Sequence, residues 1–473
     1  MTEPELLILG AGPAGIGAAL AAREVGLDTV VVDANPAPGG QVYRAPPADF
    51  RLSTRNPDRR TGEALRAALA ASGASIASDH TVWSVGRDLR VDAVGPAGPV
   101  CWRPRTLLVA AGTSERVVPF PGWTLPGVLG LAAATILLKS QAMLPGRRTV
   151  VAGCGPLLAA VAHAIVKAGG EVAAVVDLAA RRDWALRLPA LATRPEDLIR
   201  GLGWRAGVLW AGVPWHYRHG IRRAIRENDA LGVEIGPVDA EGAPLPGPTQ
   251  TLQADALVVG HGLTPATEVL RLLGAEHSFQ RQAGGWVPVL DRDQRTNVPG
   301  LYAAGDGCGV LGAAAALQRG WLAGFAVARD LERLNPDHHR LWSAPHRHSL
   351  RRMHRAGRAM AGLLALRPGQ VAAIPADTVV CRCESITRGE IDAALDQGAR
   401  ELNTLKSWTR CGMGPCQGRM CGETAAELVA ARVGSRERAG LWTPRVPLRP
   451  VDLGVLTGEY EYGDIGIPEA APL

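Results

Sequence analysis

A short apolar run near the N-terminus is followed at once by closely spaced glycines. Residues 6–9 read Leu-Leu-Ile-Leu, and the glycines that follow have the spacing G-x-G-x-x-G: Gly10, Gly12 and Gly15. An alanine-rich segment comes next, and residues 28–33 form a second apolar run that ends in Asp33. Apolar runs of this length are typical of buried parallel strands. The order strand, glycine loop, helix, strand and acid predicts a dinucleotide-binding β-α-β unit.

The predicted helix would point its N-terminus at the ligand, where free N–H groups and the helix dipole favour a pyrophosphate. Gly10 allows the tight turn, Gly12 lets the backbone approach the pyrophosphate, and Gly15 lets the helix pack closely on the strand. The acid can accept a hydrogen bond from a ribose hydroxyl. The predicted contacts are therefore Gly10, Gly12, Pro13, Ala14, Gly15 and Asp33.

Two later apolar runs end in small residues and would bring more backbone to the same ligand. Residues 106–113 end at Gly112 and Thr113, and residues 297–306 end in Gly305 and Asp306, which is expected to open an alanine-rich helix over 312–317. With the first glycine loop, these segments resemble the pyridine nucleotide–disulfide reductase superfamily over roughly residues 1–330. The resemblance implies that FAD occupies the first site and that Asp306 contacts its ribityl and phosphate region.

The stretch after the first acid departs from the disulfide-reducing branch of that superfamily. The branch carries a CxxxxC pair there, whereas residues 38–44 of this chain contain no cysteine. Dithiol chemistry beside the flavin is therefore not expected. Gly40 and Gln41 are predicted to pass close to the cofactor instead, and a plain turn is the alternative.

The glycine pattern occurs a second time with one change. Gly153 and Gly155 follow an apolar run, and residues 172–177 end in Asp177, but Leu158 replaces the third glycine. A leucine there would push the helix away from the strand. By position this is the nicotinamide-nucleotide unit of the superfamily, so NAD(P) or another nucleotide is the candidate ligand. It would be held by both glycines and by Asp177, which favours NAD over NADP. A relic that keeps only the fold is the alternative.

Five of the eight cysteines cluster near the C-terminus: Cys381, Cys383, Cys411, Cys416 and Cys421. Clustered thiolates suit an iron–sulfur cluster or a structural zinc ion. Between the two cysteine groups, Thr387 and Glu390 form a capping-box pattern that predicts a helix to about residue 398. The glycine-rich loop over 412–418 could donate N–H groups to cluster sulfurs.

This cysteine string resembles the [2Fe-2S] domain of bacterioferritin-associated ferredoxin. The resemblance implies that four residues bind the cluster: Cys381, Cys383, Cys416 and Cys421. Cys411 and Cys416 also form a C-x4-C pair, so the alternative set replaces Cys421 with Cys411. Four thiolates could equally hold zinc, which would be redox-silent.

The predicted fold is α/β, with two Rossmann-like three-layer domains and a small, mainly helical [2Fe-2S] domain. The expected boundaries are as follows: an FAD domain over 1–140 and 260–332, an NAD(P)-type domain over 141–259, a linker or connecting helix over 333–375, the [2Fe-2S] domain over 376–435 and a tail over 436–473.

As a whole, residues 1–450 resemble the large flavoprotein subunits of heteromeric amino-acid and amine dehydrogenases, a family that includes opine oxidase, hydrogen cyanide synthase, and hydroxyproline and proline dehydrogenase subunits. The resemblance implies a relay of electrons from a substrate-oxidising β subunit of the glycine/D-amino-acid oxidase type. A small ferredoxin-like γ subunit is a candidate partner, and FMN at a subunit interface is a candidate cofactor. Two other functions fit the motifs: an NAD(P)H-dependent reductase that feeds the cluster, and a non-catalytic scaffold.

Composition and side-chain pattern narrow the remaining possibilities. The net charge is +6 over 473 residues and the arginines are scattered, so nucleic-acid binding is not expected. No carboxylate pair or Ser/His/Asp set predicts a catalytic residue. The acidic N-terminus and the lack of a long apolar run predict a cytoplasmic protein with at most peripheral membrane contact.

Overall fold

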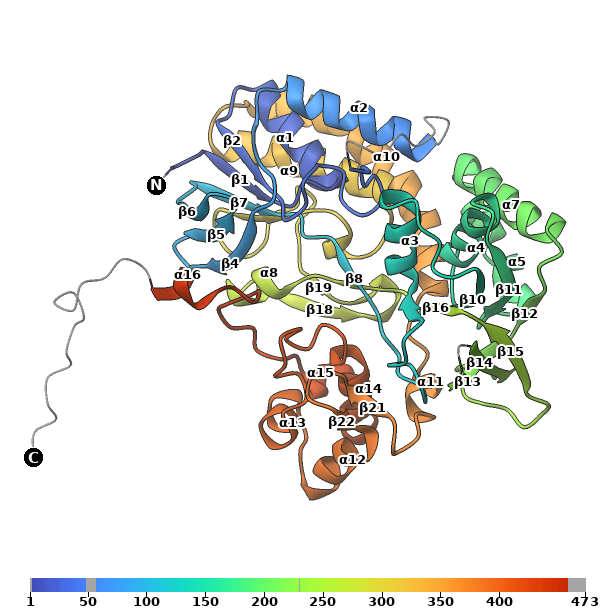
Figure 1. Cartoon of the computed structure of the whole chain (residues 1–473). Helices are drawn as coiled ribbons and strands as arrows, with labels where there is room; N and C mark the ends of the chain where they lie inside the picture. The colour runs from blue at the N-terminus through green and yellow to red at the C-terminus, as the bar shows by residue number, and fades with distance from the viewer. Residues whose placement is uncertain (1, 48–56, 229, 458–473) are drawn as a thin grey trace, which may run out of the picture.

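The computed structural model describes residues 2–47, 57–228 and 230–457. Two sheet-based units lie side by side above a smaller, mainly helical C-terminal domain (Figure 1). The first sheet has the order β20-β7-β1-β2-β3 and is parallel throughout. Its strands are β1 (Leu6–Leu9), β2 (Thr29–Val32), β3 (Ser75–Ala77), β7 (Thr106–Val109) and β20 (Leu301–Ala303). This arrangement confirms the predicted α/β class.

Helices cover one face of the first sheet and a small antiparallel sheet covers the other (Figure 1). The helices are α1 (Pro13–Glu24), α2 (Pro57–Ala71) and α9 (Ala313–Asp330), and the small sheet is β4 (Thr81–Val85), β5 (Val91–Gly95) and β6 (Gly98–Trp102). α1 and α9 pack through small residues, because a Cβ atom on Gly324 would lie 2.5 Å from the carbonyl oxygen of Ala18. The close packing of these helices holds the first glycine loop over the sheet edge.

The second sheet has the order β12-β11-β10-β16-β9. Its strands are β9 (Val128–Gly130), β10 (Arg148–Gly153), β11 (Glu171–Asp177), β12 (Trp215–Tyr217) and β16 (Ala256–Gly260). The helices of this unit are α3 (Leu131–Ser140), α4 (Leu157–Lys167), α5 (Arg181–Ala185), α6 (Leu188–Leu191) and α7 (Pro195–Trp210), and its antiparallel strands are β13 (His219–Glu227), β14 (Ala230–Pro237) and β15 (Gln250–Ala254). β9 pairs with β16, so residues 128–130 form an edge of the second sheet.

Two antiparallel pairs lie between the two units and the C-terminal domain. β8 (Thr113–Glu115) pairs with β17 (Leu263–Pro265), and β18 (His277–Gln280) pairs with β19 (Gly285–Pro288). α8 (Glu268–Leu272) follows β17 directly. The chain thus crosses between the sheets through β8 and returns through β17.

The segment over 333–375 contains one long helix and one short one. α10 (Pro336–Leu363) is capped at its start by Asn335, whose side chain accepts a hydrogen bond from the N–H of His338. α10 packs against α9, where the ring of His346 stacks on Trp321 with centroids 5.0 Å apart. α11 (Pro368–Ala372) then leads into the C-terminal domain.

The C-terminal domain has its own buried core. It contains β21 (Val379–Cys381), β22 (Ile386–Thr387), α12 (Arg388–Gln397), α13 (Leu402–Thr409), α14 (Gly422–Val433) and α15 (Arg436–Ala439). The predicted capping box is confirmed, since the side chains of Thr387 and Glu390 each bond the other's backbone N–H. α16 (Leu453–Thr457) ends the described chain, and no helix among the described residues is long and apolar enough to cross a membrane.

Candidate functional site

The first glycine loop forms a slot lined by backbone. A Cβ atom on Gly12 would have only the Cα atom of Gly40 near it, at 3.8 Å, and one on Gly40 would lie 3.0 Å from the Cα atom of Gly12. Gly40 has φ +60°, a conformation that residues with side chains rarely adopt. Two loops that are distant in sequence therefore face each other with no side chain between them. This slot fits a pyrophosphate at the N-terminus of α1.

Asp33 is 8% exposed and lies beside this slot. Its Oδ2 accepts a hydrogen bond from the N–H of Ala11 at 2.6 Å, and its Oδ1 accepts one from Asn35 Nδ2 at 2.7 Å. Arg44 in turn donates to Asn35 Oδ1 at 2.7 Å and to Gln41 Oε1 at 3.2 Å. The predicted residues Asp33 and Gln41 thus belong to one polar chain. Asn35 and Arg44 were not predicted as site residues. Their positions in the sequence could have indicated them, because Asn35 follows Asp33 closely and Arg44 follows the glycine pair that ends at Gly40.

The turn that begins at Asp306 passes close to Gly112. A Cβ atom on Gly307 would be 3.1 Å from the carbonyl oxygen of Gly112. Asp306 does not open α9, because it begins a short 3-10 turn (Asp306–Cys308) and α9 begins at Ala313. Its carboxylate instead accepts hydrogen bonds from the N–H groups of Leu311 at 2.9 Å and Gly312 at 3.0 Å. Burial raises the pKa of Asp306, and these two donors oppose the rise.

The second glycine loop places its predicted residues differently. Gly153 ends β10, and Leu158 is fully buried in α4. Asp177 is 0% exposed, and both of its oxygens are engaged inside the unit: Oδ1 accepts from the N–H of Ala179 at 2.9 Å and Oδ2 from Trp184 Nε1 at 3.2 Å. Burial raises the pKa of Asp177 to about 6.

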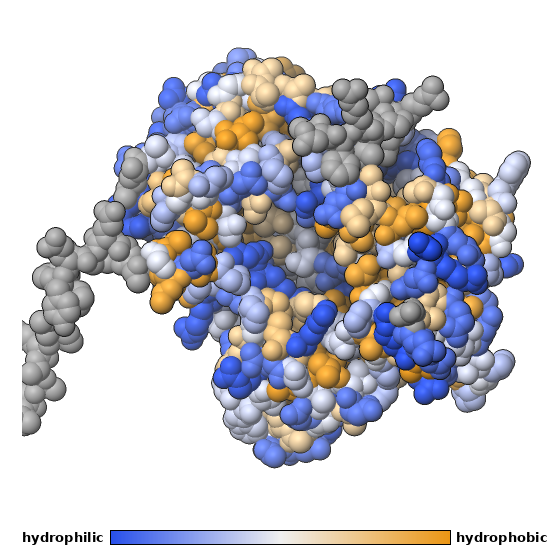
Figure 2. Space-filling model, viewed as in Figure 1, coloured by the Kyte–Doolittle hydropathy of each residue, from blue (hydrophilic) through white to orange (hydrophobic). Residues whose placement is uncertain are grey.

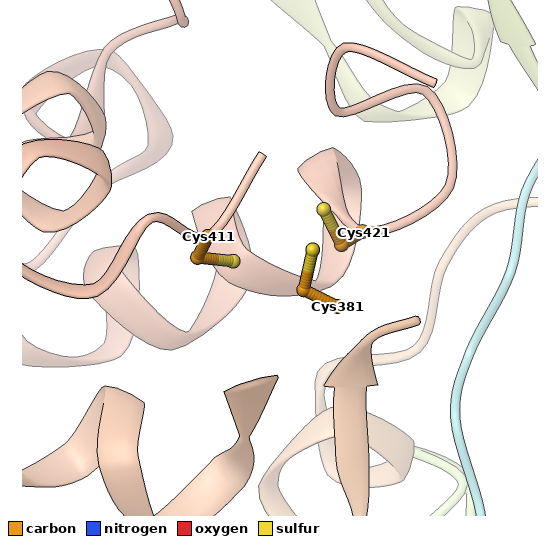
Figure 3. A group of neighbouring side chains, drawn as sticks. All are labelled: Cys381, Cys411 and Cys421. Atoms are coloured by element: carbon orange, nitrogen blue, oxygen red, sulfur yellow. The ribbon is translucent and has the colours of Figure 1, made fainter. Parts of the chain in front are cut away.

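The cysteines of the C-terminal domain gather into two neighbouring groups. Cys381, Cys411 and Cys421 are buried, and their Sγ atoms all lie within 4.8 Å of one another (Figure 3). The thiols of Cys411 and Cys421 hydrogen-bond to Cys381 and hold the pKa of its thiol well below the usual range, and the N–H groups of Gly412 and Glu384 act in the same direction. Such donors suit a sulfur that carries negative charge in a cluster.

The second group is Cys383 with Cys416. Cys383 is exposed and Cys416 is half-buried. The two residues hydrogen-bond to each other, while burial, as the largest effect, raises the pKa of the Cys383 thiol. Cys383 lies against Gly414, since a Cβ atom on that glycine would be 3.1 Å from Cys383 Sγ. The glycine is therefore needed for the loop to pass the exposed thiol.

Both ligand sets considered from the sequence contain Cys381, Cys383 and Cys416. They differ only in whether Cys411 or Cys421 completes the four, and both of these lie beside Cys381. A two-iron cluster needs two thiolates on each iron. The two groups supply such pairs: Cys383 with Cys416, and Cys381 with one of its two neighbours.

The indole of Trp442 covers the glycine-rich loop. Cβ atoms on Gly412 and Gly422 would lie 2.8 Å and 3.0 Å from its ring, and one on Gly418 would overlap it. Trp442 Nε1 donates to the carbonyl oxygen of Leu402 at 3.0 Å, which fixes the ring in place. The glycines of the loop therefore make room for a tryptophan from the segment that the sequence placed in a tail.

A buried ion network joins the C-terminal domain to the first unit. Arg436 donates to Glu423 Oε1 and to Glu427 Oε2, both at 2.9 Å, and Arg281 reaches Glu427 at 2.6 Å. Arg116 is 3% exposed and lies 3.8 Å from Glu423. Burial alone would raise the pKa of Glu423, but Arg436 and Arg116 hold it below its ordinary value. These charges together fix the orientation of α14 relative to the first unit.

A cavity of about 480 Å³ lies between the cysteine loop and the first unit. Its walls include Thr264 and Thr267 from the region of β17 and α8, and Gly412 and Gln417 from the cysteine loop. Figure 2 shows that the face of the molecule is also hollowed beside α3, between the two sheet units.

Comparisons with known proteins agree with this architecture. Residues 4–321 match the pyridine nucleotide-disulphide oxidoreductase family, and residues 379–431 match the BFD-like [2Fe-2S] binding domain. The chain belongs to the pyridine nucleotide-disulphide oxidoreductases. Members of this family are flavin-dependent oxidoreductases, so the first glycine loop belongs to an FAD-binding domain and the cysteine group to a [2Fe-2S]-binding domain.

Among these oxidoreductases, an opine oxidase subunit from Rhizobium meliloti is 37% identical to this chain, over 95% of the chain and 97% of the relative. The corresponding opine oxidase subunit from Agrobacterium tumefaciens is 34% identical over 96% and 91%. Hydrogen cyanide synthase subunit HcnB of Pseudomonas aeruginosa is 34% identical over 94% and 96%. The solved structure of L-proline dehydrogenase from P. horikoshii shares the fold, with a TM-score of 0.70 and 20% identity over 96% of this chain and 79% of that one.

Proposed function

We propose that this chain is the flavin and iron–sulfur electron-transfer subunit of a heteromeric dehydrogenase for an amino acid or amine of the opine or hydroxyproline type. A partner β subunit, which would be a flavoprotein of the glycine/D-amino-acid oxidase type, would oxidise the C–N bond, and a small ferredoxin-like γ subunit is a candidate third member. The observation that carries the proposal is the placement of the cysteine loop and the flavin unit on the two sides of one cavity. A redox group held in this cavity would lie between the flavin unit and the cysteine loop.

The cofactors would supply the redox chemistry, since a flavin takes up electrons in pairs and a [2Fe-2S] cluster takes them singly. The chain's own residues would place and tune them. Gly12 and Gly40 leave the slot for the pyrophosphate, and the N–H groups of Gly412 and Glu384 stabilise charge on Cys381. Hydrogen bonds to the sulfurs raise the reduction potential of a cluster.

FMN belongs to this proposal as a second flavin at the interface with the partner. Lys406 and Arg445 line the cavity, and their positive charges suit a phosphate-bearing group. The cavity is partly open to solvent, so a partner could complete it. The names of the relatives support a heteromeric assembly, because each is called a subunit.

The proposal is tested by anaerobic reduction of the purified complex, made by co-expression with a flavoprotein of the amino-acid oxidase type. Substrate should reduce the cluster, seen by electron paramagnetic resonance, only when the partner is present. The variant Cys383→Ser should retain FAD and lose the cluster signal, whereas the control Cys101→Ser should keep both. A cluster that stays oxidised in the wild-type complex while the partner flavin is reduced would rule out the relay.

A further inference from the structure

The two glycine loops of this chain differ in what lies over their second glycine. In a Rossmann unit, this glycine is where the backbone approaches the pyrophosphate. At Gly12 the space beyond the Cα atom is open, apart from Gly40 at 3.8 Å. At Gly155 a Cβ atom would overlap Cδ2 of Leu364, which lies directly against the loop. A leucine side chain therefore occupies the place that a pyrophosphate would need.

Leu364 is held in this position from both ends. Its carbonyl oxygen accepts a hydrogen bond from Arg116 Nη1 at 2.9 Å, and that arginine also donates to the carbonyl oxygen of Gly284 at 2.6 Å. Its side chain packs on a buried cluster that consists of Cys154, Leu178 and Val238. The leucine is thus partly buried against the interior of the second unit.

The next residues cover the adjacent strand end. Arg367 Nη1 donates to the carbonyl oxygen of Leu178, just beyond β11, at 2.7 Å. A Cβ atom on Gly369 would lie 2.6 Å from the carbonyl oxygen of Glu241, and one on Gly242 would lie 3.2 Å from Cβ of Arg367. The chain over 364–370 therefore passes tightly between the end of β11 and the turn at 239–243, where an adenosine would lie in a dinucleotide complex.

The two acids differ in the same way. Asp33 bonds to the N–H of Ala11 and so lies at its glycine loop. At the equivalent position of the second unit, the N–H of Cys154 donates to the carbonyl oxygen of Gly260 at 2.9 Å. Asp177 is turned to Ala179 and Trp184 instead and has no exposed surface. It offers no oxygen to a ribose hydroxyl.

We infer that the second Rossmann unit holds residues 364–370 of its own chain in place of a nicotinamide dinucleotide. The second unit then serves as a docking site for the segment of its own chain that leads from α10 into the cysteine domain. The second glycine motif predicted an NAD(P) site, but the residues present there do not fit NAD(P). This inference concerns a site that the relay proposal does not use, so each can fail without the other.

The inference is tested on the full chain by binding of NADH and NADPH, followed by nucleotide fluorescence, and by hydrogen exchange of the amides over 364–374. The wild type should show no saturable binding up to millimolar nucleotide. The protection of residues 364–374 from hydrogen exchange should be the same with and without nucleotide. Saturable binding in the micromolar range, or loss of protection on addition of NADH, would overturn the inference and identify the segment as a displaceable cover.

Two variants sharpen the test. Leu364→Ala removes the side chain over Gly155 and should speed amide exchange over 364–374 at least tenfold. Leu341→Ala changes a leucine of α10 that is 67% exposed and should leave this exchange unaltered. Unchanged exchange in Leu364→Ala would show that the leucine does not seat the segment. Should Leu364→Ala fail to fold, the two wild-type measurements still decide the matter.

Discussion

The fifth cysteine of the C-terminal domain is the main point on which the sequence left a choice. The Sγ atoms of Cys411 and Cys421 both lie within 4.8 Å of the Sγ atom of Cys381, so either residue could bind the same metal ion as Cys381. Hydrogen bonding to Cys381 is the largest cause that raises the thiol pKa of both residues, and burial adds to it. Geometry alone therefore gives both residues access to the same metal, and the resemblance to the [2Fe-2S] family favours Cys421.

We expect Cys421→Ser to lose most of its iron and Cys411→Ser to retain it, because an iron–sulfur cluster is held by thiolates and only one of the two completes the set. Iron and sulfide analysis of anaerobically purified chains measures this directly. The opposite pattern would assign Cys411 as the ligand, and zinc in place of iron in the wild type would identify a structural zinc site.

The slot between Gly12 and Gly40 can be tested with a matched pair of glycine changes. Gly40 and Gly26 both have positive φ, +60° and +76°, but a Cβ atom on Gly26 meets nothing within 4 Å. Both changes to alanine should cost about 1 kcal/mol of backbone strain. Only Gly40→Ala should also lower FAD affinity, by about tenfold or more, as measured by flavin retention on dialysis. Equal flavin loss in both variants would mean that strain alone is responsible.

At the element scale, the start of α3 combines a favourable and an unfavourable effect. Glu115, at the end of β8, accepts a hydrogen bond from the N–H of Ala132 at 3.0 Å at this helix N-terminus. The helix dipole favours a carboxylate there. Burial is the larger effect and raises the pKa of Glu115 to about 7. The folded state therefore prefers the protonated acid, and ionisation of Glu115 destabilises the fold.

The sign of this shift predicts the pH dependence. A folded-state pKa above the ordinary value of 4.5 means that stability is lost as pH rises from about 4.5 to 7. Glu115→Gln removes the ionisation, so the variant should match the wild type near pH 4.5 and exceed it by up to about 3 kcal/mol above pH 7. Urea unfolding at several pH values, with saturating FAD, measures the difference in unfolding free energy between the variant and the wild type. A gap that is constant with pH would contradict the assignment.

At the scale of the whole molecule, three features hold the C-terminal domain against the rest of the chain. The first feature is the ion network at α14. The second is the segment after α15, which is bonded to the first unit: Arg271 donates to the carbonyl oxygen of Trp442 at 2.7 Å, and the N–H of Leu448 donates to the carbonyl oxygen of Trp83 at 2.7 Å. The third feature is the seat of Leu364 on the second unit. Because these contacts come from three separate segments, we expect the cysteine domain to keep a fixed distance from the flavin unit.

Removal of one member of the buried network should be costly, since it leaves uncompensated charge in the interior. We expect Arg436→Met to lower the free energy of unfolding by about 3 kcal/mol or more. The control Arg432→Met breaks the exposed pair with Asp396 and should cost about 0–1 kcal/mol. Urea unfolding of both variants tests this, and similar losses in the two would show that the network contributes little.

Because the pKa of Glu423 is lowered in the folded state, the contribution of Glu423 to the free energy of unfolding should be present at neutral pH and fade as pH falls below about 4.5.

Local patterns in the sequence were enough to predict the α/β class, the glycine loops, the capping box at Thr387 and the cysteine domain. Each signal is a spacing or periodicity within a few tens of residues, and backbone geometry converts it directly into a loop, helix or strand. Contacts between distant residues left no such signal. Leu364 lies over Gly155, Trp442 lies over the cysteine loop, and Arg116 bonds the carbonyl groups of several separate segments. The second glycine motif could therefore predict a Rossmann unit correctly, while the occupant of its nucleotide position depended on how a segment far along the chain packs against it.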